Sequence, residues 1–174
     1  PVDANDNAPM IVKNMCVASK KAGVGPMAAV AGIIAEEVGK ELLRYTPEVI
    51  VENGGDVYIK TNFPRKIGIY AGKSPLSLKI TLEIRPEETP VGICTSSGTV
   101  GHSLSFGSAD AAVVVSPDAA LADAAATALG NRIKSPADIE PALNFICGVS
   151  GIRGALAIAG NKMGAIGNIR VGGI

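Results

Sequence analysis

Residues 120–129 read ALADAAATAL, a run of alanine and leucine interrupted by one aspartate and one threonine. Alanine is the strongest helix former and aspartate a weak one. The run therefore predicts a helix, and Asp123 makes this helix less stable than alanine would by roughly a few tenths of a kcal/mol. Asp123 and Thr127 are four residues apart and therefore lie one turn from each other on the same face. The small alanine side chains would let a cofactor or another backbone approach closely.

Two interpretations of this pair follow from the residues. In the first, Asp123 caps a neighbouring backbone or faces solvent, and Thr127 hydrogen-bonds to its own helix. In the second, Asp123 and Thr127 are an oxygen-ligand pair for Mg²⁺, which takes one or two protein oxygens together with substrate phosphates and water. The residues alone leave both interpretations open.

The flanking sequence gives this helix its limits and predicts three others. Ser116-Pro117-Asp118 supplies an N-cap, a first-turn proline and an acid at the positive end of the helix, and Gly130 is suited to end it. A helical pattern follows Pro9 and stops at Gly23. Another has Pro26 in its first turn and runs to about Arg44, buried at its start and solvated at its end, and a short helix follows Ser135-Pro136.

The remaining periodic segments predict strands. NGGD (53–56) separates two β-rich runs and indicates a tight hairpin turn. The expected strands are RKIGIYAG (65–72), PLSLKITLEIRP (75–86), AAVVVS (111–116), IRGALAIAG (152–160) and AIGNIRVGGI (165–174), and in the second of these Leu76, Leu78, Ile80, Leu82 and Ile84 alternate onto one face. We therefore expect an α+β domain in which a mainly antiparallel sheet packs with helices.

Composition excludes several classes of protein. The chain has 174 residues, of which 47% are hydrophobic, so one domain can close a core. Sixteen basic residues balance sixteen acidic ones and aromatic residues make up 3%, which argues against a nucleic-acid surface. The longest apolar stretch, 27–35, is about half of the roughly 20 residues that span a bilayer. We expect a soluble protein without a membrane partner.

Cysteine and histidine usage limits the metal chemistry. The three cysteines are widely spaced without a C-x-x-C pair, and there is one histidine, His102. This pattern predicts neither a disulfide framework nor a zinc cluster, and fits a reducing, cytoplasmic compartment. A metal would be held mainly by oxygen. The chain opens at Pro1 without a methionine, so we expect a tag, a cleavage or an upstream segment before it.

Three loops contain residue types that bind ligands. GVGPMAAVAG (23–32) places glycines before a helix N-terminus, where free N–H groups favour an anion, although the same residues would also serve tight helix packing. Asp56, the last residue of NGGD, could accept a hydrogen bond from a ribose hydroxyl or a base N–H. CTSSGTVGHS (94–103) contains the residues for a nucleophilic Cys94/His102 or Ser/His pair. The alternative is that Cys94 is simply buried. The hydroxyl and N–H groups of this loop are also suited to bind phosphate.

Four stretches taken in order resemble one family: GVGPMAAVAG (23–32), VENGGDVYI (51–59), CTSSGTVGHSLSFGSAD (94–110) and ADAAATAL (122–129). They look like those of the UPF0280 proteins, a branch of the ApbE-like superfamily whose main members are FAD:protein FMN transferases. The resemblance covers essentially the whole chain. It implies a single ApbE-like domain over 1–174 that lacks an upstream N-terminal segment.

The resemblance also implies a site. In the transferases an Asp and a Thr four residues on hold Mg²⁺ beside the FAD pyrophosphate, and this pattern matches Asp123 and Thr127. The family's GGD turn matches Gly54, Gly55 and Asp56, and its SG loop matches Ser97 and Gly98. The expected cofactor-binding residues are Gly25, Met27, Gly54, Gly55, Asp56, Thr95, Ser96, Ser97 and Gly98, the expected metal ligands are Asp123 and Thr127, and the expected catalytic residues are His102 and Asp123.

The family pattern is incomplete in two places. The transferases carry a Lys-Gly pair in the helix that matches AAVAGIIAEE (28–37), and the lysine is absent here. They also carry a His followed by an Asp-Pro element after the SG loop, where this chain has GHSLSFG (101–107). His102 matches the histidine, but its acidic partner is missing.

The implied activity is Mg²⁺-dependent FAD binding with transfer of FMN to a protein threonine, or cleavage of the FAD pyrophosphate to FMN and AMP. The expected partners are a flavin nucleotide or another phosphate-bearing small molecule, an acceptor protein and a second copy of the chain. The alternative is a non-catalytic accessory or binding protein, linked by family association with sulfur assimilation (homocysteine formation) in anaerobes. A cysteine- or serine-dependent hydrolase is a third class.

Overall fold

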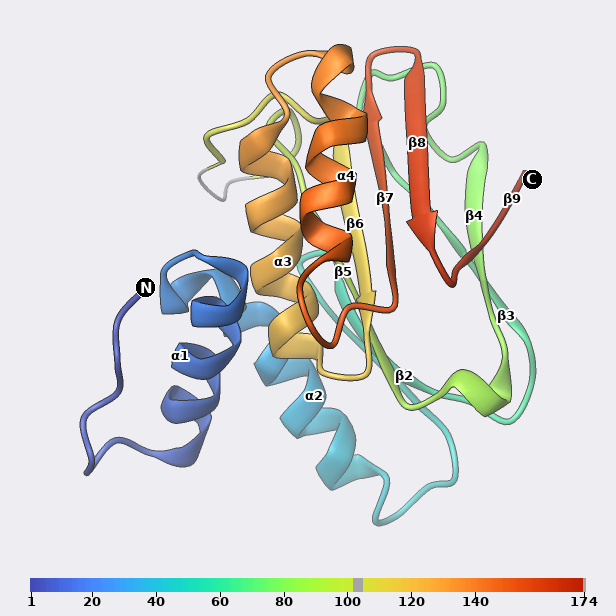
Figure 1. Cartoon of the computed structure of the whole chain (residues 1–174). Helices are drawn as coiled ribbons and strands as arrows, with labels where there is room; N and C mark the ends of the chain where they lie inside the picture. Colours follow the sequence, from blue (N-terminus) through green and yellow to red (C-terminus); the bar gives the residue numbers. More distant parts are fainter. Residues whose placement is uncertain (102–104, 174) are drawn as a thin grey trace.

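The computed structural model describes residues 1–101 and 105–173 and has three layers (Figure 1). One layer consists of helices: α1 Met10–Ala22, α2 Val30–Leu42, α3 Ala119–Arg132 and α4 Ile139–Cys147, with short 3-10 helices η1 Pro26–Ala29, η2 Pro86–Glu88 and η3 Pro136–Asp138 elsewhere in the chain. The middle layer is a sheet of β1 Val49–Asn53, β2 Asp56–Lys60, β5 Val91–Ser96, β6 Ala111–Ser116, β7 Gly154–Ala159 and β8 Lys162–Gly167. The third layer is a sheet of β3 Arg65–Gly68, β4 Ile80–Ile84 and β9 Arg170–Gly173.

Both sheets are antiparallel. The six strands follow the order β1-β2-β5-β6-β7-β8, and the three strands the order β3-β4-β9. Neighbouring strands pair in opposite directions throughout, as in Val57 opposite Ile93 and Cys94 opposite Val114. The predicted α+β class with a mainly antiparallel sheet is therefore confirmed.

The alternation of side chains along the middle sheet creates two cores. Ile93, Val113 and Leu156 face the small sheet and belong to one apolar cluster. Cys94 and Val114, one position along, face the helices and belong to the other cluster. Successive side chains of a strand point to opposite faces, so a sheet covered on both sides must be apolar in continuous runs, as in β6.

The helix α3 is the central element of the helical layer. Eleven of its fourteen residues are buried, and α1, α2 and α4 all contact it. Two neighbouring elements come so close to the backbone of α3 that only glycine fits at the contact. A Cβ on Gly92 of β5 would lie 2.5 Å from the Ala119 Cα, and a Cβ on Gly32 of α2 would lie 2.3 Å from the Ala119 carbonyl oxygen. Ala119, directly before ALADAAATAL, and the facing glycines therefore let both α2 and β5 approach α3 closely.

Most predicted elements are present. The hairpin turn has Gly54 and Gly55 at φ angles of 65° and 102°, and α1 ends at Gly23 in the left-handed region, as expected. The N-cap of α3 is Asp118 and not Ser116: its Oδ1 accepts from the Leu121 N–H at 2.9 Å, so the proline precedes the cap. The helix continues through Gly130 to Arg132.

Two other expectations about single segments are wrong. The predicted strand over 75–86 is formed only by β4, because Leu78 adopts a positive φ of 57° and is 53% exposed, outside the alternating face. The start of the second helical segment is not buried on every side. Met27 is 71% exposed and Ile34 is 43% exposed, so α2 carries apolar side chains on its outer face.

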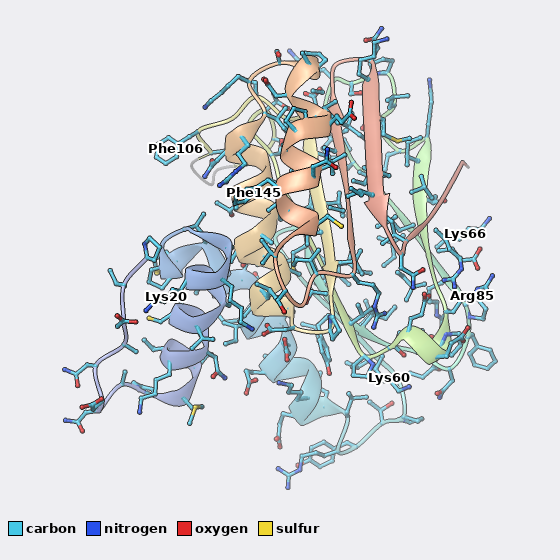
Figure 2. The ribbon with its side chains drawn as sticks, viewed as in Figure 1. Lys20, Lys60, Lys66, Arg85, Phe106 and Phe145 are labelled. Carbon is cyan, nitrogen blue, oxygen red and sulfur yellow. The ribbon has the colours of Figure 1, made fainter. Side chains whose placement is uncertain are left out.

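The charge distribution agrees with the balanced composition. In Figure 2, Lys20 lies on α1, whereas Lys66 and Arg85 lie at the small sheet on the other side of the molecule. Arg85 pairs with Glu83 at 3.0 Å, and Lys66 lies opposite Glu83 in the sheet. These labelled side chains therefore do not form one basic stripe.

Among the described residues, no single helix has the length and apolar composition needed to cross a membrane. The bent pair Met10–Ala22 and Pro26–Leu42, with 102° between its helices, meets that test only when its two parts are taken together.

The close contact at Gly32 leads to a prediction about stability. Gly32→Ala would place a Cβ against the Ala119 carbonyl and the Asp123 Cβ, so we expect a loss of about 2–3 kcal/mol in the free energy of unfolding, despite the better helix propensity of alanine. Gly25→Ala is the control, because no atom lies within 4 Å of its Cβ position and its φ of −77° suits alanine. Urea denaturation measures both, and equal stabilities of the two variants would contradict the packing described.

Candidate functional site

The candidate site is built on two buried carboxyl groups from distant parts of the chain. Asp56 is the first residue of β2, directly after the Gly54-Gly55 turn, and is 6% exposed. Asp123 lies in the middle of α3 and is 9% exposed. The charge of Asp56 raises the pKa of Asp123, so the two carboxyl groups are close enough to interact. The sequence prediction that the GGD turn and the AD helix share one site is consistent with this arrangement.

Each carboxyl group accepts a backbone hydrogen bond from a third element. Asp56 Oδ1 accepts from the Thr95 N–H of β5 at 3.1 Å. Asp123 Oδ2 accepts from the Gly32 N–H of α2 at 2.9 Å. These bonds fix one oxygen of each side chain, and neither acid forms an ion pair with a lysine or arginine in the described part of the chain.

The bond to Gly32 is half of a reciprocal arrangement between two helices. Gly32 is the third residue of α2, where N–H groups have no partner within the helix, and the N-cap residue Ala29 gives no side-chain bond. In the other direction, Glu36 Oε2 accepts from the N–H of Ala119, the first residue of α3, at 2.6 Å. Each helix therefore supplies a carboxylate to the N-terminus of the other.

This arrangement answers two of the questions raised by the sequence. The helix N-terminus in GVGPMAAVAG, the start of α2, does bind an anionic group, but that group is the carboxylate of Asp123 in the protein itself. The first interpretation of Asp123, that it caps a neighbouring backbone, is therefore confirmed for one of its oxygens. The Ala31 N–H, one residue earlier, also hydrogen-bonds to this carboxylate, so the N-terminus of α2 supplies both of the backbone groups that lower the pKa of Asp123.

Burial raises the pKa of both acids. The pKa of Asp56 rises to about 6, mainly by desolvation, with a smaller effect from the charge of Glu52, while hydrogen bonds from Cys94 and Thr95 lower it. The pKa of Asp123 rises to about 7, again mainly by desolvation and then by the charge of Asp56. Two carboxyl groups without a cationic side chain are costly to ionise together, so each favours the protonated form.

Cys94 lies beside these acids but is not arranged as a nucleophile. It is fully buried, and its thiol donates to the Ala119 carbonyl at 3.4 Å. Burial, followed by the charges of Asp56 and Asp123, raises the pKa of the thiol well above its usual value. A thiol in these surroundings stays protonated, which disfavours a Cys94-dependent hydrolase. His102, the predicted partner and a predicted catalytic residue, lies outside the described residues.

Thr127 lies one turn beyond Asp123 on α3 and is half-buried. The side chain of Ser19 bonds back to the Met15 carbonyl of its own helix, but no such bond is formed by Thr127 with any described residue. Gly130, one turn further, faces Ser96 of β5: a Cβ there would lie 3.4 Å from the Ser96 Oγ. Asp123, Thr127 and Ser96 thus lie along one contact line between α3 and β5, here called the α3–β5 seam.

The loop after β5 forms hydrogen bonds within itself. The Gly98 N–H donates to the Ala109 carbonyl at 2.8 Å, and the N–H groups of Thr99 and Val100 donate to Ser97 Oγ at 3.1 and 3.0 Å. In this structure the N–H groups of these three residues are thus used within the loop, and the predicted role of Thr95, Ser96, Ser97 and Gly98 in cofactor binding stays a prediction. Thr95 contributes its backbone N–H to Asp56.

The far end of this loop rests on the C-terminal end of α3. A Cβ on Gly107 would lie 1.7 Å from the Gly130 carbonyl oxygen, and the Phe106 N–H donates to Asn131 Oδ1 at 2.9 Å. Phe106 itself is 68% exposed and projects from the molecule (Figure 2). The loop is thus attached to α3 at the end opposite Gly32.

Gly25 and Met27 are not brought to the acids by any described hydrogen bond. Both precede α2, Gly25 as the residue before η1 and Met27 within it, and both are exposed. Their predicted role in cofactor binding stays a prediction, as does that of Gly54 and Gly55, which form the turn before Asp56.

Sequence reasoning missed Glu36, and for Gly32 it offered only the tight helix packing of GVGPMAAVAG, which the close approach to Ala119 confirms, and not the hydrogen bond to Asp123. Their signal is a four-residue spacing that occurs on both helices: a small residue followed by an acid, as Gly32 and Glu36 on α2 and as Ala119 and Asp123 on α3. Because the spacing equals one helical turn, two antiparallel helices that meet at the small residues bring each acid to the N-terminus of the other. The spacing does not say which two helices meet, so the contact is recognised only in the folded chain.

The donor set suits a hard cation with few protein ligands. Across residues 1–101 and 105–173, no cluster of three or more His, Cys, Asp or Glu side chains could hold a metal. The oxygens at the seam are two carboxyl groups and the hydroxyl groups of Thr127 and Ser96. Mg²⁺ prefers oxygen and is commonly bound by one or two carboxylates with water and substrate phosphates, so these residues fit it.

Comparison with known proteins identifies relatives of the whole chain. A family model described as "AbpE bacteria" matches residues 1–145. A UPF0280 protein of Methanocella arvoryzae is 47% identical over 173 residues, covering 97% of this chain and 69% of the relative. UPF0280 proteins of Methanothrix thermoacetophila and Methanosarcina acetivorans are 46% and 42% identical, covering 94% and 97% of this chain and 69% and 67% of those relatives.

The raised pKa values predict how stability depends on pH. Both carboxyl groups have an ordinary pKa of 3.8 but one of about 6 or 7 in the folded protein, which therefore binds more protons than the unfolded chain between these values. The free energy of unfolding should fall as the pH rises from about 4 to about 7. Asp123→Asn removes one of these titrations and keeps an acceptor for Gly32, so we expect a shallower fall between pH 5 and pH 8 by urea denaturation.

Asp138→Asn is the control for this measurement. Hydrogen bonds from Ser135 and Lys134 lower the pKa of Asp138, so this side chain stays ionised between pH 5 and pH 8. The variant should keep the wild-type slope. An Asp123→Asn protein with that same slope would show that Asp123 does not titrate in this range.

Proposed function

This chain belongs to the UPF0280 family, and we propose that it binds a flavin nucleotide together with Mg²⁺ at the α3–β5 seam and cleaves or transfers at the pyrophosphate. The flavin part rests on the resemblance of four motifs to those of FAD:protein FMN transferases. The metal part rests on the chemistry of the site.

One observation carries the proposal. Asp56 and Asp123 are two buried acids that interact with each other, and within residues 1–101 and 105–173 no lysine or arginine forms an ion pair with either of them. A buried carboxylate pair is strongly unfavourable unless it is protonated or neutralised by a cation. With a pKa of about 7 for Asp123, a divalent cation that competes with the proton would bind near neutral pH.

Different residues of the site would bind the metal, bind a phosphate oxygen and accept a proton. The Asp123 carboxylate and the Thr127 hydroxyl would hold Mg²⁺, since no described residue forms an ion pair with Asp123 or a hydrogen bond with the Thr127 hydroxyl. Bound Mg²⁺ neutralises the charge that develops on the pyrophosphate oxygens. The Ser96 hydroxyl would donate to a phosphate oxygen, and Asp56 would accept a proton.

The reaction breaks the P–O bond between the two phosphates of FAD. The oxygen of water, or of a threonine in an acceptor protein, forms the new bond to the phosphorus of FMN, and AMP leaves. The attacking hydroxyl loses its proton, and a carboxyl group with a pKa of about 6, such as Asp56, is suited to accept it near neutral pH. His102 remains a predicted participant.

A non-catalytic binding protein is the second candidate. It is favoured by the observation that one oxygen of Asp123 already caps α2 and that the N–H groups of Gly98, Thr99 and Val100 are used within their loop. Such a protein would bind the nucleotide and present it to a partner, including one of sulfur assimilation, without breaking the pyrophosphate.

Incubation with FAD and Mg²⁺, followed by chromatography of FMN and AMP, tests the enzyme. We expect both products in equal amounts, with loss of activity in Asp123→Asn. Thr127→Val removes a hydroxyl that makes no described hydrogen bond, so the fold should be retained while Mg²⁺ affinity falls about tenfold or more, as seen when groups supporting a metal site are removed. Thermal unfolding at increasing Mg²⁺ concentrations measures that affinity.

Thr46→Val is the matched control for the hydroxyl, since Thr46 is exposed in the connection between α2 and β1. It should leave Mg²⁺ affinity unchanged. Binding of FAD without FMN or AMP would favour the accessory protein. Equal Mg²⁺ affinity in the wild-type, Asp123→Asn and Thr127→Val proteins would refute the site.

A further inference from the structure

We propose that Asn53 is a positioning residue of the proposed site. Its side-chain amide ties the hairpin turn before Asp56 to the peptide group that holds Asp123, and it acts through these two acids and not on the substrate itself. The inference rests on the proposed function for its effect on Mg²⁺ binding. The hydrogen bonds that carry it belong to the fold.

The hydrogen bond of Asn53 joins β1 to a single peptide group of α2. Asn53 is the last residue of β1, and its side-chain amide donates to the Ala31 carbonyl at 3.2 Å. The N–H of the same peptide group is that of Gly32, which donates to Asp123 Oδ2 at 2.9 Å. One peptide group is therefore bonded to Asn53 through its carbonyl and to Asp123 through its N–H.

The planar peptide group transmits this contact. The C=O and N–H of a trans peptide lie in one plane and point in opposite directions, so a bond that fixes the carbonyl also fixes the direction of the N–H. Hydrogen bonds that are linked in a chain polarise one another, so the N–H becomes a stronger donor when the carbonyl accepts. Asn53 therefore orients and strengthens the bond that Gly32 donates to Asp123.

The same residue fixes the position of Asp56. Asn53 and Asp56 lie opposite each other as the pair of the β1–β2 ladder that flanks the turn. Asp56 Oδ1 also accepts from the Thr95 N–H of β5 at 3.1 Å. The end of the hairpin is thus attached to α2 through Asn53 and to β5 through Thr95, and α2 and β5 both pack against α3. Asn53 therefore contributes to the placement of Asp56 relative to Asp123.

The turn does not require the Asn53 side chain. A two-residue hairpin turn of this kind needs positive φ angles at its two central positions. Gly54 and Gly55 provide them, at 65° and 102°. The Gly55 N–H donates to Glu52 Oε1 at 2.6 Å, which is a local side-chain bond within the hairpin. The side-chain amide of Asn53 instead bonds to another element, so it serves the relative placement of the elements and not the formation of the turn.

The Mg²⁺ affinity of Asn53→Leu tests the proposal. Leucine keeps the approximate size of asparagine but has no hydrogen-bonding group in its side chain. We expect the dissociation constant for Mg²⁺, measured by thermal unfolding at increasing Mg²⁺ concentrations, to rise about tenfold or more, as when other groups that orient metal ligands are removed.

Thr89→Val is the control for a loss of stability alone. Like Asn53, Thr89 is half-buried and links two segments: its hydroxyl donates to the Pro86 carbonyl at 2.8 Å and accepts from the Thr61 N–H at 3.3 Å. Thr61 follows the end of β2 that is opposite Asp56. The variant should keep the wild-type Mg²⁺ affinity.

Carboxyl-carbon NMR at a fixed pH tests the positioning without Mg²⁺. The charge of Asp56 acts on Asp123, so Asp56→Asn should shift the Asp123 resonance. In the Asn53→Leu background we expect less than half of that shift, because the two acids are no longer held in place. In the Thr89→Val background we expect the whole of it.

Three results would overturn the proposal: a full shift in the Asn53→Leu background, equal losses of Mg²⁺ affinity in Asn53→Leu and Thr89→Val, or an unchanged affinity in Asn53→Leu when the wild-type protein binds Mg²⁺. Failure of the proposed function gives a different result. If the wild-type protein binds no Mg²⁺ but the shift depends on Asn53, the placement of the acids by Asn53 is supported and the metal function is refuted.

Discussion

The structure depends on the reciprocal contact between α2 and α3. Gly32 lets α2 approach the backbone of α3 at Ala119, and at this distance Asp123 reaches the Gly32 N–H while Glu36 reaches the Ala119 N–H. Helix N-termini carry unpaired N–H groups and a partial positive charge, so a carboxylate there is stabilising. The contact therefore fixes the register of the two helices and, with it, the position of Asp123 over β5.

The same contact explains why the site is chemically unusual. Close packing buries Asp123 and leaves it backbone hydrogen bonds from Gly32 and Ala31 at the N-terminus of α2, while Asp56 lies at the hairpin turn before β2. These bonds offset only part of the cost of desolvation, and the charge of Asp56 adds to that cost, so the pKa of Asp123 remains raised.

Local signals in the sequence were sufficient for much of the fold. The NGGD hairpin, the stop of α1 at Gly23 and the helix over ALADAAATAL each depend on neighbouring residues and were predicted. One failure depends on a distant part of the chain: Leu78 donates its N–H to the Ile69 carbonyl and adopts a positive φ, so the strand begins only at Ile80. Asp123 and Asp56 were predicted to share a site, but Glu36 and Gly32 were not, because their role exists only when two helices meet.

The central claim is that Asp123 is a buried acid with a raised pKa whose proton a divalent cation can replace. Carboxyl-carbon NMR of isotope-labelled protein, with Asp123→Asn for assignment, measures that pKa directly with and without Mg²⁺. We predict a value of about 7 for the free protein and a clear decrease when Mg²⁺ is added. A pKa near 4 that Mg²⁺ does not change would contradict the account.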